Sequence, residues 1–578
     1  MADELHWDGR AELRAARRQS RGLIVMVGIF SVFVNLLMLT GPLYMLNVYD
    51  RVLNSRSAET LLALSVLVAF LYAMMAVLDH VRGRVMGRVG ARFQSALDRR
   101  VFAAALAASR SGRPPSEAGT GLRDLEGVQR MLISPALMAL FDLPWAPIFI
   151  WGIFIFHPLM GWLAVAGGLV LVAVALFNQL STRRALADAQ ARAYEADRFG
   201  AQILGESEVV QALGMTGAAY DRWHVARQQA LTEGIAAADR VGGFSSTTKG
   251  LRLFLQSAML GVGAWLVLQD VLSPGAMIAG SILLGRALAP IELIIGQWAV
   301  IQRGREGWNR LGRLLSMVPP ETPRTALPAP RARVSAEQVT VVPPGEKAAA
   351  LRLISFTVQP GQAVGVIGTS GAGKSTLARV LTGLWAPAGG TVRLDGAALD
   401  QYAPDVLGSY IGYLPQRVQL FDGTIAENIA RLATEPDPEA VVKAARRAAA
   451  HEMILKLPDG YDTRVTSNGG RLSGGQIQRI GLARAMYGDP VVLVLDEPNS
   501  NLDNDGSQAL NAAIREFKAA GRIVFVMAHR PAAIQECDTL LVIEDGMRRA
   551  FGAKDEVLRS MVKNHAEIGL PGQTGHVT

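Results

Sequence analysis

The sequence has 578 residues, of which 50% are hydrophobic and only 19% are charged. One hydrophobic core does not extend over a chain of this length, so two or three domains are expected. The net charge of +8 would suit a nucleic-acid partner, but the arginines stand beside long apolar runs and form no single patch, which argues against such a partner and for a membrane. The single cysteine, Cys537, cannot form an internal disulfide, as expected of a reduced, cytosolic site.

The first 21 residues are polar and basic. Arg14, Arg17, Arg18 and Arg21 recur at helical spacing and form one cationic face. Two interpretations carry equal weight: a helix lying on the cytoplasmic leaflet, or a positive flank before a membrane span. A cleaved signal peptide is not expected, because the apolar run that follows is too long and lacks a cleavage site.

Six apolar runs follow, each long enough to cross a lipid bilayer. They cover residues 22–46, 58–78, 132–156, 158–180, 251–269 and 274–298. The connections alternate between short segments (47–57, 157 and 270–273) and long ones (79–131 and 181–250). The first long connection is rich in arginine, which places both long connections, the N-terminus and everything after the sixth run in the cytoplasm.

The long connections are polar and helical in pattern. We expect helices that continue well past the membrane and touch the rest of the protein at their tips, near residues 99–108 and 215–223.

Few ionisable residues lie within the apolar runs. Asp142 lies in the third run, and Arg286 and Glu292 flank Pro290 in the sixth. They either line a passage for a substrate or form a structural ion pair beside a proline kink. The structural alternative is favoured for Asp142, and both remain open for Arg286.

After the sixth run the composition changes. Residues 317–333 are rich in proline and predict a linker, 334–562 alternate strand and helix patterns as in an α/β domain, and 563–578 form a tail. Within the α/β segment an apolar strand, 363–367, runs into a glycine-rich loop that precedes a helix, the context of a phosphate-binding P-loop. The loop consists of Gly368, Thr369, Ser370, Gly371, Ala372, Gly373, Lys374, Ser375 and Thr376.

Each residue type in this loop suits a nucleotide. Gly368, Gly371 and Gly373 let the backbone approach a phosphate closely, and the free N–H groups at the start of the helix attract the anion. Lys374 supplies a positive charge to the terminal phosphates, and Ser375 supplies a hydroxyl to Mg²⁺.

Further polar residues follow at strand ends and helix starts. Gln416 follows an apolar strand, Asp496 and Glu497 end another, and His529 follows a third. Ser473, Gly474, Gly475 and Gln476 lie at a helix start and form a second candidate anion site. One more acid, Asp503, follows the strand that ends at Asp496.

This order of motifs over residues 334–560 resembles the ATP-binding cassette (ABC) ATPase. The resemblance and the needs of phosphoryl transfer imply that Ser375, Gln416 and Asp496 hold Mg²⁺ and that Glu497 polarises the attacking water. His529 would contact the γ-phosphate, and Gln416 would sense the metal and the water. Ser473, Gly474, Gly475, Gln476 and Asp503 would face the nucleotide of another protomer.

Two features depart from that family pattern. Residues 340–345 contain no aromatic to stack on adenine, and residues 466–469 lack the acid that many exporters place before the second anion site. The way in which adenine is held therefore cannot be transferred from the family. The same is true of coupling between the cassette and the membrane domain through that acid.

The expected fold is a six-helix membrane domain of the type I ABC exporter kind fused to an α/β P-loop ATP-binding cassette. One P-loop and one Ser-Gly-Gly segment per chain predict a homodimer, because a complete site needs one of each from opposite chains.

Residues 42–53, 285–290 and 496–503 are also similar to the permease/ATPases of type I secretion systems. That resemblance implies a multi-pass protein of the bacterial inner membrane that passes an unfolded polypeptide with a C-terminal secretion signal. Its partners would be a periplasmic membrane fusion (adaptor) protein and an outer-membrane channel protein. The N-terminal peptidase-like domain of some relatives is expected to be absent, since the first run begins near Gly22.

Two alternatives remain at this point. A lipid or drug exporter would share every cassette motif. A regulatory protein that binds ATP without pumping is a different class, and the presence of Glu497 and His529 argues against it.

Overall fold

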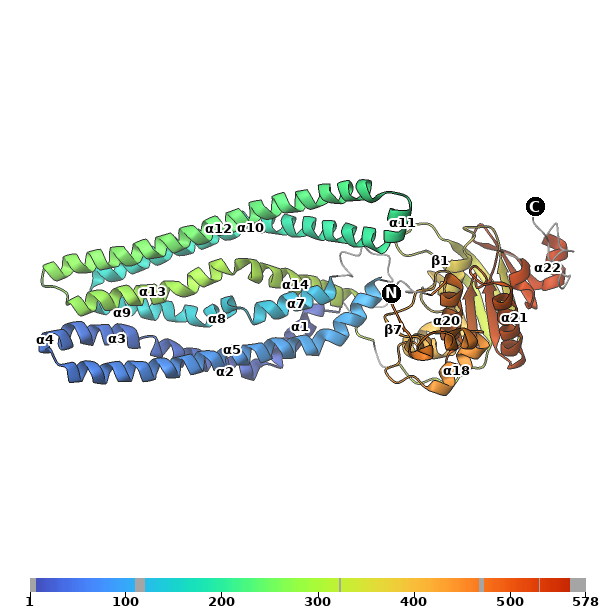
Figure 1. The fold of residues 1–578 in the computed structure, drawn as a ribbon, viewed down its shortest axis with the longest axis horizontal. Helices are drawn as coiled ribbons and strands as arrows, with labels where there is room; N and C mark the ends of the chain where they lie inside the picture. The colour runs from blue at the N-terminus through green and yellow to red at the C-terminus, as the bar shows by residue number, and fades with distance from the viewer. Residues whose placement is uncertain (1–6, 110–119, 322–323, 467–471, 530, 562–578) are drawn as a thin grey trace. The chain divides into compact units, whose positions relative to one another are not determined.

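The computed structural model describes residues 7–109, 120–321, 324–466, 472–529 and 531–561. The chain divides between Pro320 and Glu321 into two compact units, here called the helical unit and the α/β unit. Both units are drawn in Figure 1.

The helical unit contains no strands among its described residues. Its elements are α1 (Gly9–Arg18), α2 (Arg21–Leu37), α3 (Thr40–Asn47), a π-helical turn η1 (Val48–Val52), α4 (Leu53–Ser55), α5 (Ala58–Ser109), α7 (Gly121–Leu132), α8 (Pro135–Asp142), a 3-10 turn η2 (Leu143–Trp145), α9 (Ala146–Phe156), α10 (Pro158–Gly205), α11 (Ser207–Ala212), α12 (Thr216–Leu268), α13 (Pro274–Gly296) and α14 (Trp298–Met317).

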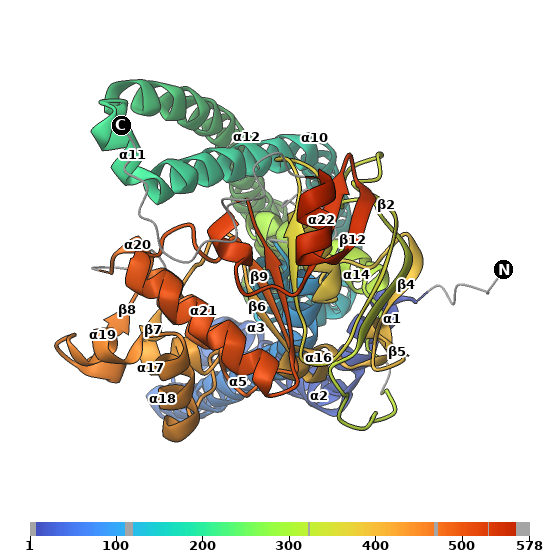
Figure 2. The same ribbon diagram turned by 90° about the vertical axis from the view of Figure 1, so that its right-hand side faces the viewer.

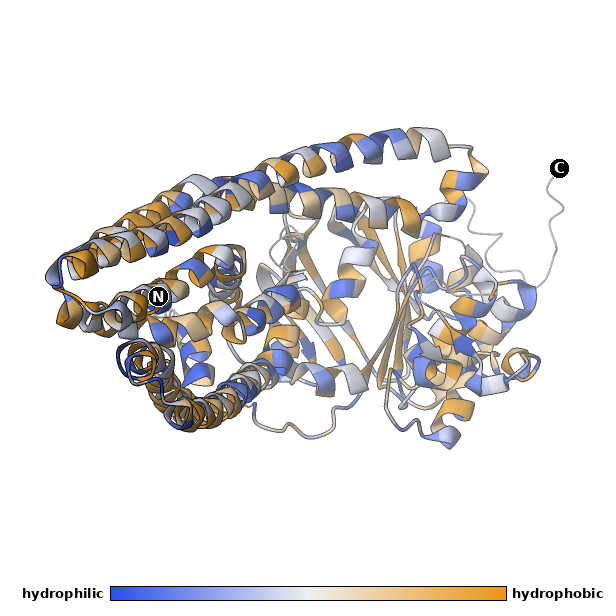
Figure 3. Ribbon diagram, turned by 60° about the vertical axis from the view of Figure 1, so that its left-hand side comes forward, coloured by the Kyte–Doolittle hydropathy of each residue, from blue (hydrophilic) through white to orange (hydrophobic). Residues whose placement is uncertain are grey.

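Within the described residues, six helices or helix runs are long and apolar enough to cross a membrane. They match the six predicted runs, and they begin at Arg21, Ala58, Pro135, Pro158, Thr216 and Pro274. Figure 3 shows hydrophobic residues along the half of α10 and α12 near the α12–α13 turn and more hydrophilic ones toward α11.

The first short connection, 47–57, is mostly helical. The helix pauses only at Met38 and Leu39 and then continues through η1 and α4 to Ser55. It ends where Arg56 adopts a left-handed conformation, with φ 53°. From 43 to 55 the sequence has neither glycine nor proline, so nothing in it stops a helix earlier.

The third span begins later than predicted. Leu132 ends α7, and a new helix starts at Pro135, where the Ser134 hydroxyl accepts a hydrogen bond from the Leu137 N–H. Serine before proline is a strong helix start, because proline lacks an N–H and a donor in the first helical turn would have no partner within the helix anyway. The span narrows to a 3-10 turn over Leu143–Trp145, where Pro144 again removes a donor.

The long connections are helical, as predicted. α5, α10 and α12 contain 52, 48 and 53 residues. At 1.5 Å per residue such helices measure about 70–80 Å, more than twice the apolar core of a bilayer. Residues 99–108 lie in the last turns of α5, and α11 with Met215 forms the turn between α10 and α12. Contact of these tips with the α/β unit stays a prediction.

The N-terminal helix α1 buries its apolar side on α14. Leu13 and Ala16 are buried there, and Gly9 packs so closely that a Cβ would lie 2.5 Å from the Gly312 carbonyl oxygen. Glu12 pairs with Arg100 of α5 at 3.1 Å. The arginines of α1 are exposed, but they also contact the protein: Arg17 lies over the Trp308 ring of α14, and Arg14 pairs with Asp8 at 2.6 Å.

Asp142 is held in a structural ion pair, which confirms the interpretation favoured for this residue. Arg82 of α5 reaches Asp142 at 2.7 Å, and Asn35 of α2 donates to the same carboxylate at 2.8 Å. Glu292 pairs at 2.5 Å with Arg252 of α12. In the described part of the chain Arg286 has no such partner, and α13 runs on through Pro290 without a break.

The α/β unit contains two main sheets and a set of helices. The strands are β1 (Val334–Val341), β2 (Leu351–Val358), β3 (Ala363–Ile367), β4 (Gly389–Leu394), β5 (Ala397–Ala398), β6 (Ile411–Leu414), β7 (Gly423–Thr424), β8 (Arg464–Val465), β9 (Val492–Asp496), β10 (Ile523–Met527), β11 (Thr539–Glu544) and β12 (Met547–Ala553). The helices are α15 (Lys374–Leu381), α16 (Pro404–Tyr410), α17 (Ile425–Ile429), α18 (Pro438–Arg447), α19 (His451–Leu455), α20 (Gly474–Met486), α21 (Asn504–Ala519) and α22 (Lys554–Met561), with 3-10 turns η3 (Leu399–Gln401), η4 (Gly460–Asp462) and η5 (Pro531–Ile534).

The central sheet has six strands in the order β12-β11-β3-β10-β9-β6, parallel except for β12. A second, antiparallel sheet has the order β2-β1-β4-β5. Figure 2 shows the helices α17–α21 on one side of the central sheet and the antiparallel sheet on the other. β3, β9 and β10 are buried almost throughout because both faces are covered, which explains their uninterrupted apolar sequences.

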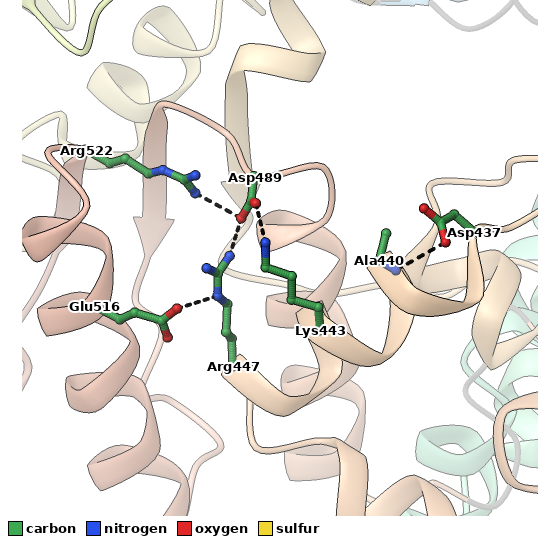
Figure 4. A network of polar contacts seen from close by, with 7 residues as sticks. All are labelled: Asp437, Ala440, Lys443, Arg447, Asp489, Glu516 and Arg522. Atoms are coloured by element: carbon green, nitrogen blue, oxygen red, sulfur yellow. Dashed lines mark hydrogen bonds and ion pairs between the residues drawn. The ribbon is translucent and has the colours of Figure 1, made fainter.

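An ion cluster ties the helices to the sheet (Figure 4). Asp489, in the loop between α20 and β9, contacts Lys443 at 2.6 Å, Arg522 at 3.0 Å and Arg447, which also binds Glu516 at 2.7 Å. Partial burial alone would raise the pKa of Asp489, but the hydrogen bonds from these three cations hold it well below its usual value.

Residues before β1 also contact the α/β unit. Arg324 donates to the Tyr402 carbonyl, and the Arg331 N–H donates to Asp395 at 2.9 Å. The part of the predicted linker that follows residue 323 therefore packs on the antiparallel sheet.

Candidate nucleotide-binding site

The predicted site residues leave the central sheet at one edge. β3, β10, β9 and β6 are parallel, and Met527 pairs with both Val366 and Asp496, while Leu495 pairs with Leu414. The segments after these strands carry the P-loop, His529, Glu497 and Gln416. The carboxyl ends of parallel strands are the usual place for a ligand, because the polar loops meet there.

The P-loop backbone requires its glycines. Gly371 and Gly373 have φ of 80° and 102°. A Cβ on Gly368 would lie 2.2 Å from the Ile543 carbonyl oxygen. α15 starts directly after this turn, at Lys374, so its unpaired N–H groups face the loop.

Lys374 is buried, and its ammonium group lies within the loop. It donates to the carbonyl oxygens of Gly368 and Thr369, both at 2.9 Å. Burial lowers the pKa of Lys374, and the nearby Glu497 and Asp496 act in the opposite direction. The lysine is therefore a cation held by backbone carbonyls, and these are weak partners that a phosphate can replace.

Ser375 and Asp496 form a pair of oxygen groups beside Lys374. The Ser375 hydroxyl donates to Asp496 Oδ1 at 3.2 Å. Burial raises the pKa of Asp496, while the hydrogen bond from Ser375 lowers it. A hydroxyl and a carboxylate on adjacent elements are the ligands that a hard divalent cation prefers.

Glu497 and His529 contact each other across the ends of β9 and β10. His529 Nε2 lies 3.0 Å from Glu497 Oε1. Glu497 has a left-handed backbone, with φ 52°, which non-glycine residues seldom adopt. Its N–H donates to the Met527 carbonyl at 3.0 Å, and its carbonyl accepts from the Ser500 N–H at 3.2 Å. The backbone is thus fixed on both sides, and strain of this kind concentrates at functional sites.

Gln416 reaches the same edge from β6. The register that pairs Leu414 with Leu495 brings Gln416 level with Glu497. Gln416 is exposed in this structure, so its side chain is free to contact a ligand.

The other predicted nucleotide-binding residues form a group at the start of α20. Ser473 caps this helix in a reciprocal arrangement: its hydroxyl accepts from the Gln476 N–H at 3.3 Å, and its own N–H donates to Gln476 Oε1 at 2.8 Å. A Cβ on Gly475 would lie 2.9 Å from the Asn501 carbonyl, so the helix start packs against the segment that leads to Asp503.

Asp503 has a structural role that sequence reasoning missed. It caps α21 by accepting from the Gly506 N–H at 2.8 Å, and it pairs at 2.5 Å with Arg479 of α20. These interactions lower the pKa of the Asp503 carboxyl. They also join Asp503 to the Ser473 helix, so the two segments present one surface.

Sequence reasoning also missed two neighbours of Asp496. Arg379, near the end of α15, hydrogen-bonds Tyr413 of β6 and acts on the Asp496 charge. Arg379 lies five residues after Lys374 on the P-loop helix, and that spacing was the available signal. The segment 466–469, where many exporters carry an acid and this sequence does not, lies outside the described residues except for Thr466.

This fold and site define an ABC transporter. Residues 351–500 match the model of the ABC transporter family, and residues 24–288 match the ABC transporter transmembrane region. The fold also matches a solved bacterial Atm1-family ABC exporter with ATP bound, with a TM-score of 0.81 over 95% of this chain and 98% of that one, at 24% identity.

The relatives narrow the class further. The chain is 42% identical to the type I secretion system ATP-binding protein PrsD of Rhizobium meliloti, over 96% of this chain and 95% of that protein. It is 29% identical to the exotoxin translocation ATP-binding protein PaxB of Pasteurella aerogenes and to the cyclolysin secretion/processing ATP-binding protein CyaB of Bordetella pertussis, in each case over 93% of this chain and 76% of the relative. The chain belongs to the ABC transporters of type I secretion systems.

This membership confirms the predicted family, fold and activity. The protein is a multi-pass membrane ATPase that couples ATP hydrolysis to transport and serves as the permease of a type I secretion system exporting proteins. The alternatives of a lipid or drug exporter and of a regulatory protein without pumping find no support in these relationships.

Proposed function

We propose that two copies of this chain bind ATP between their α/β units. The P-loop of one copy, Gly368 to Thr376, takes the phosphates. Ser473, Gly474, Gly475, Gln476 and Asp503 of the other copy close the site. Closure of the two α/β units then drives the helical units, which carry an unfolded polypeptide across the bacterial inner membrane.

One observation carries the proposal: the predicted nucleotide-binding residues fall into two groups within one chain. Lys374, Ser375, Asp496, Glu497 and His529 gather at the edge of the central sheet. The start of α20 instead packs on the Asn501–Asp503 segment and would form a separate anion site. Two half-sites in one chain make two whole sites in a two-fold dimer.

The residues at the sheet edge suit Mg²⁺. Mg²⁺ in nucleotide sites is bound through one or two carboxylates together with phosphate oxygens, and it keeps several waters. Ser375 and Asp496 supply two oxygens, and Gln416 a third from β6. The metal, when bound, neutralises charge that develops on the phosphates.

Glu497 is placed to act as the base. A carboxylate held by a constrained backbone can orient a water and accept its proton as the water attacks the γ-phosphate. His529, bound to Glu497 at 3.0 Å, would orient that carboxylate and contact the γ-phosphate.

The remaining assignments follow from the family. The N-terminus and the α/β unit would lie in the cytoplasm, and the partners would be a periplasmic membrane fusion (adaptor) protein and an outer-membrane channel protein. The arginine-rich extensions of α5 support this orientation.

Mixed dimers test the shared site. Lys374→Ala destroys a P-loop and Ser473→Arg blocks an α20 start, so each homodimer should lose ATPase activity. A dimer with one copy of each variant, isolated through two affinity tags, holds one intact composite site and should recover up to half of the wild-type rate. If both groups served the same chain's nucleotide, neither site would be intact and the mixed dimer would be inactive.

Deletion of the gene tests the cargo. We expect the loss of one or a few large proteins from the culture medium, restored by the wild-type gene and not by Glu497→Gln. A strain with an unchanged set of secreted proteins but altered lipids or drug resistance would refute the proposal.

A further inference from the structure

The helix α13 is the most enclosed of the six candidate spans. Half of its most apolar window is buried, against 28% or less for the others. It packs on α10 and α12 and also on α3, α8 and α9, and Figure 1 shows it between these groups. A side chain in the middle of α13 therefore lies deep within the membrane domain.

Arg286 occupies that middle position. It follows Pro274 by 12 residues (286 − 274) and precedes Gly296 by 10 (296 − 286). At 1.5 Å per residue these separations correspond to about 18 and 15 Å, half the apolar thickness of a bilayer on each side. Charged groups at such depth are rare and face the interior of the bundle or an aqueous path.

Among the described residues no acid pairs with Arg286. In the interior of the spans, Asp142 is bound by Arg82, Asp79 is bound by Arg82 at 2.8 Å, and Glu292 is bound by Arg252. Asp50, nearer the α12–α13 turn, accepts from the Ser273 hydroxyl at 2.6 Å. Across the described ranges Arg286 has neither an ion pair nor a hydrogen bond from its guanidinium group.

The guanidinium group is nevertheless accessible. Arg286 is half-buried, and its nitrogens are not among the buried atoms that lack a partner. Ile282, Ala289 and Leu293 follow the same side of α13 at helical spacing, and the last two are exposed. One cation thus stands on an otherwise apolar open face.

Two occupants of this face are disfavoured. Lipid tails would leave the charge unsolvated, at a cost of at least about 2.5–3.5 kcal/mol for an arginine at the centre of a span. A second copy of the chain would bring the same acids, each already engaged with its own arginine or hydroxyl. A carboxylate must then come from outside the transporter.

We propose that Arg286 binds carboxylate side chains of the exported polypeptide as it passes through the membrane domain, so that the path selects for segments rich in aspartate and glutamate. The inference rests on the proposed export of an unfolded polypeptide. A guanidinium group suits this task because it stays charged and receives a carboxylate through two parallel hydrogen bonds. One such contact holds an extended chain loosely and allows it to move on.

Binding of labelled peptides to the full-length dimer in lipid nanodiscs tests the proposal. Three unstructured glycine- and serine-based peptides carry aspartate, asparagine or lysine at the same positions, and fluorescence anisotropy gives their Kd. Wild type should bind the aspartate peptide about tenfold more tightly than the asparagine peptide, the value of one charge-assisted contact. Arg286→Gln should abolish that difference, Arg286→Lys should keep part of it, and Arg286→Glu should reverse it in favour of the lysine peptide.

The matched control is Arg252→Gln/Glu292→Gln. It removes an arginine of the neighbouring helix together with its acid and should keep the preference for aspartate. A preference that survives in Arg286→Gln, or that Arg286→Glu fails to reverse, overturns the proposal, as does loss of the dimer in Arg286→Gln, which would indicate a contact between copies. If wild type binds all three peptides equally, only the role of Arg286 fails; if it binds none, the proposed polypeptide cargo fails with it.

Discussion

Glu497 and Lys374 illustrate what individual residues do at the edge of the sheet. Both lie where the strands end, and both are constrained: Glu497 by its left-handed backbone and Lys374 by two carbonyls of its own loop. Their chemistry differs, because one acts on a water and the other holds a phosphate. Substitutions at the two positions should therefore separate hydrolysis from binding.

Replacement of Glu497 by glutamine should slow hydrolysis and leave ATP bound. A general base contributes about 10²–10⁴-fold to a rate, and glutamine keeps the shape without the basicity. Phosphate release by the purified variant and retention of radiolabelled ATP after gel filtration measure the two effects. Turnover close to wild type would show that another group positions the water.

Lys374→Ala should weaken nucleotide binding itself. Loss of a charge-assisted contact to phosphate corresponds to about 1.5–3 kcal/mol, or roughly ten- to a hundredfold in Kd. Equilibrium binding of a fluorescent ATP analogue gives the value, with Glu497→Gln as the comparison that should bind normally. Equal affinity of the two variants for the ATP analogue would show that Lys374 does not bind the phosphates.

At the scale of elements, ion pairs join helices that are distant in the sequence. Arg82, Asp142 and Asn35 connect α5, α8 and α2 within the apolar region, and the Asp489 cluster joins α18, α21 and the entry to β9 and β10. In both cases one carboxylate accepts hydrogen bonds from several donors, so loss of that carboxylate leaves the donors without their shared acceptor.

Breaking the Arg82–Asp142 pair should destabilise the helical unit. Loss of Arg82 leaves the Asp142 carboxylate in an apolar place without a cation and costs about 3–5 kcal/mol, whereas loss of the Asp142 charge costs less, because Asp79 still pairs with Arg82 at 2.8 Å. Arg82→Ala and Asp142→Asn should each lower the melting temperature of the purified protein. The double variant should lower the melting temperature by less than the sum of the two single decreases. Strict additivity of the decreases would show that the pair is not coupled. The exposed pair Arg130–Glu126 provides a control that should change little.

The Asp489 cluster predicts a dependence of stability on pH. The folded pKa of Asp489 lies below its unfolded value of 3.8, so its stabilisation is complete above that value and is lost as the pH falls through the folded pKa. In melting curves from about pH 6 to about pH 3, wild type should therefore lose stability more steeply than Asp489→Asn. Parallel curves for the two proteins would contradict this.

At the scale of the whole molecule, the question is which side of the membrane each end of the helices faces. The native chain has a single cysteine, Cys537, which is buried, and burial raises its pKa to about 12. A thiol of this kind does not react readily, because only the thiolate is nucleophilic. The protein is thus a ready background for site-directed labelling.

Asn54→Cys, on the exposed helix α4 before α5, should react with a membrane-impermeant maleimide on intact spheroplasts. Glu208→Cys, on the exposed α11, should react only after the membrane is permeabilised. The wild-type protein should react neither before nor after permeabilisation. Each variant must still export protein to count. Labelling of Glu208→Cys from outside would invert the proposed topology and place the α/β unit away from ATP.

The sequence alone determined the order of the six spans, the helical character of the long connections and the strand–loop–helix context of Gly368 to Thr376. These features depend on periodicity, length and local turn chemistry, which a linear sequence records directly. It did not reveal that Arg82 is the partner of Asp142, that Asp503 caps α21 and binds Arg479, or that Arg286 has no ion pair with any described residue. Those facts required the tertiary structure, because a side chain's partner depends on which distant helix or strand packs beside it, and spacing along the chain does not determine that.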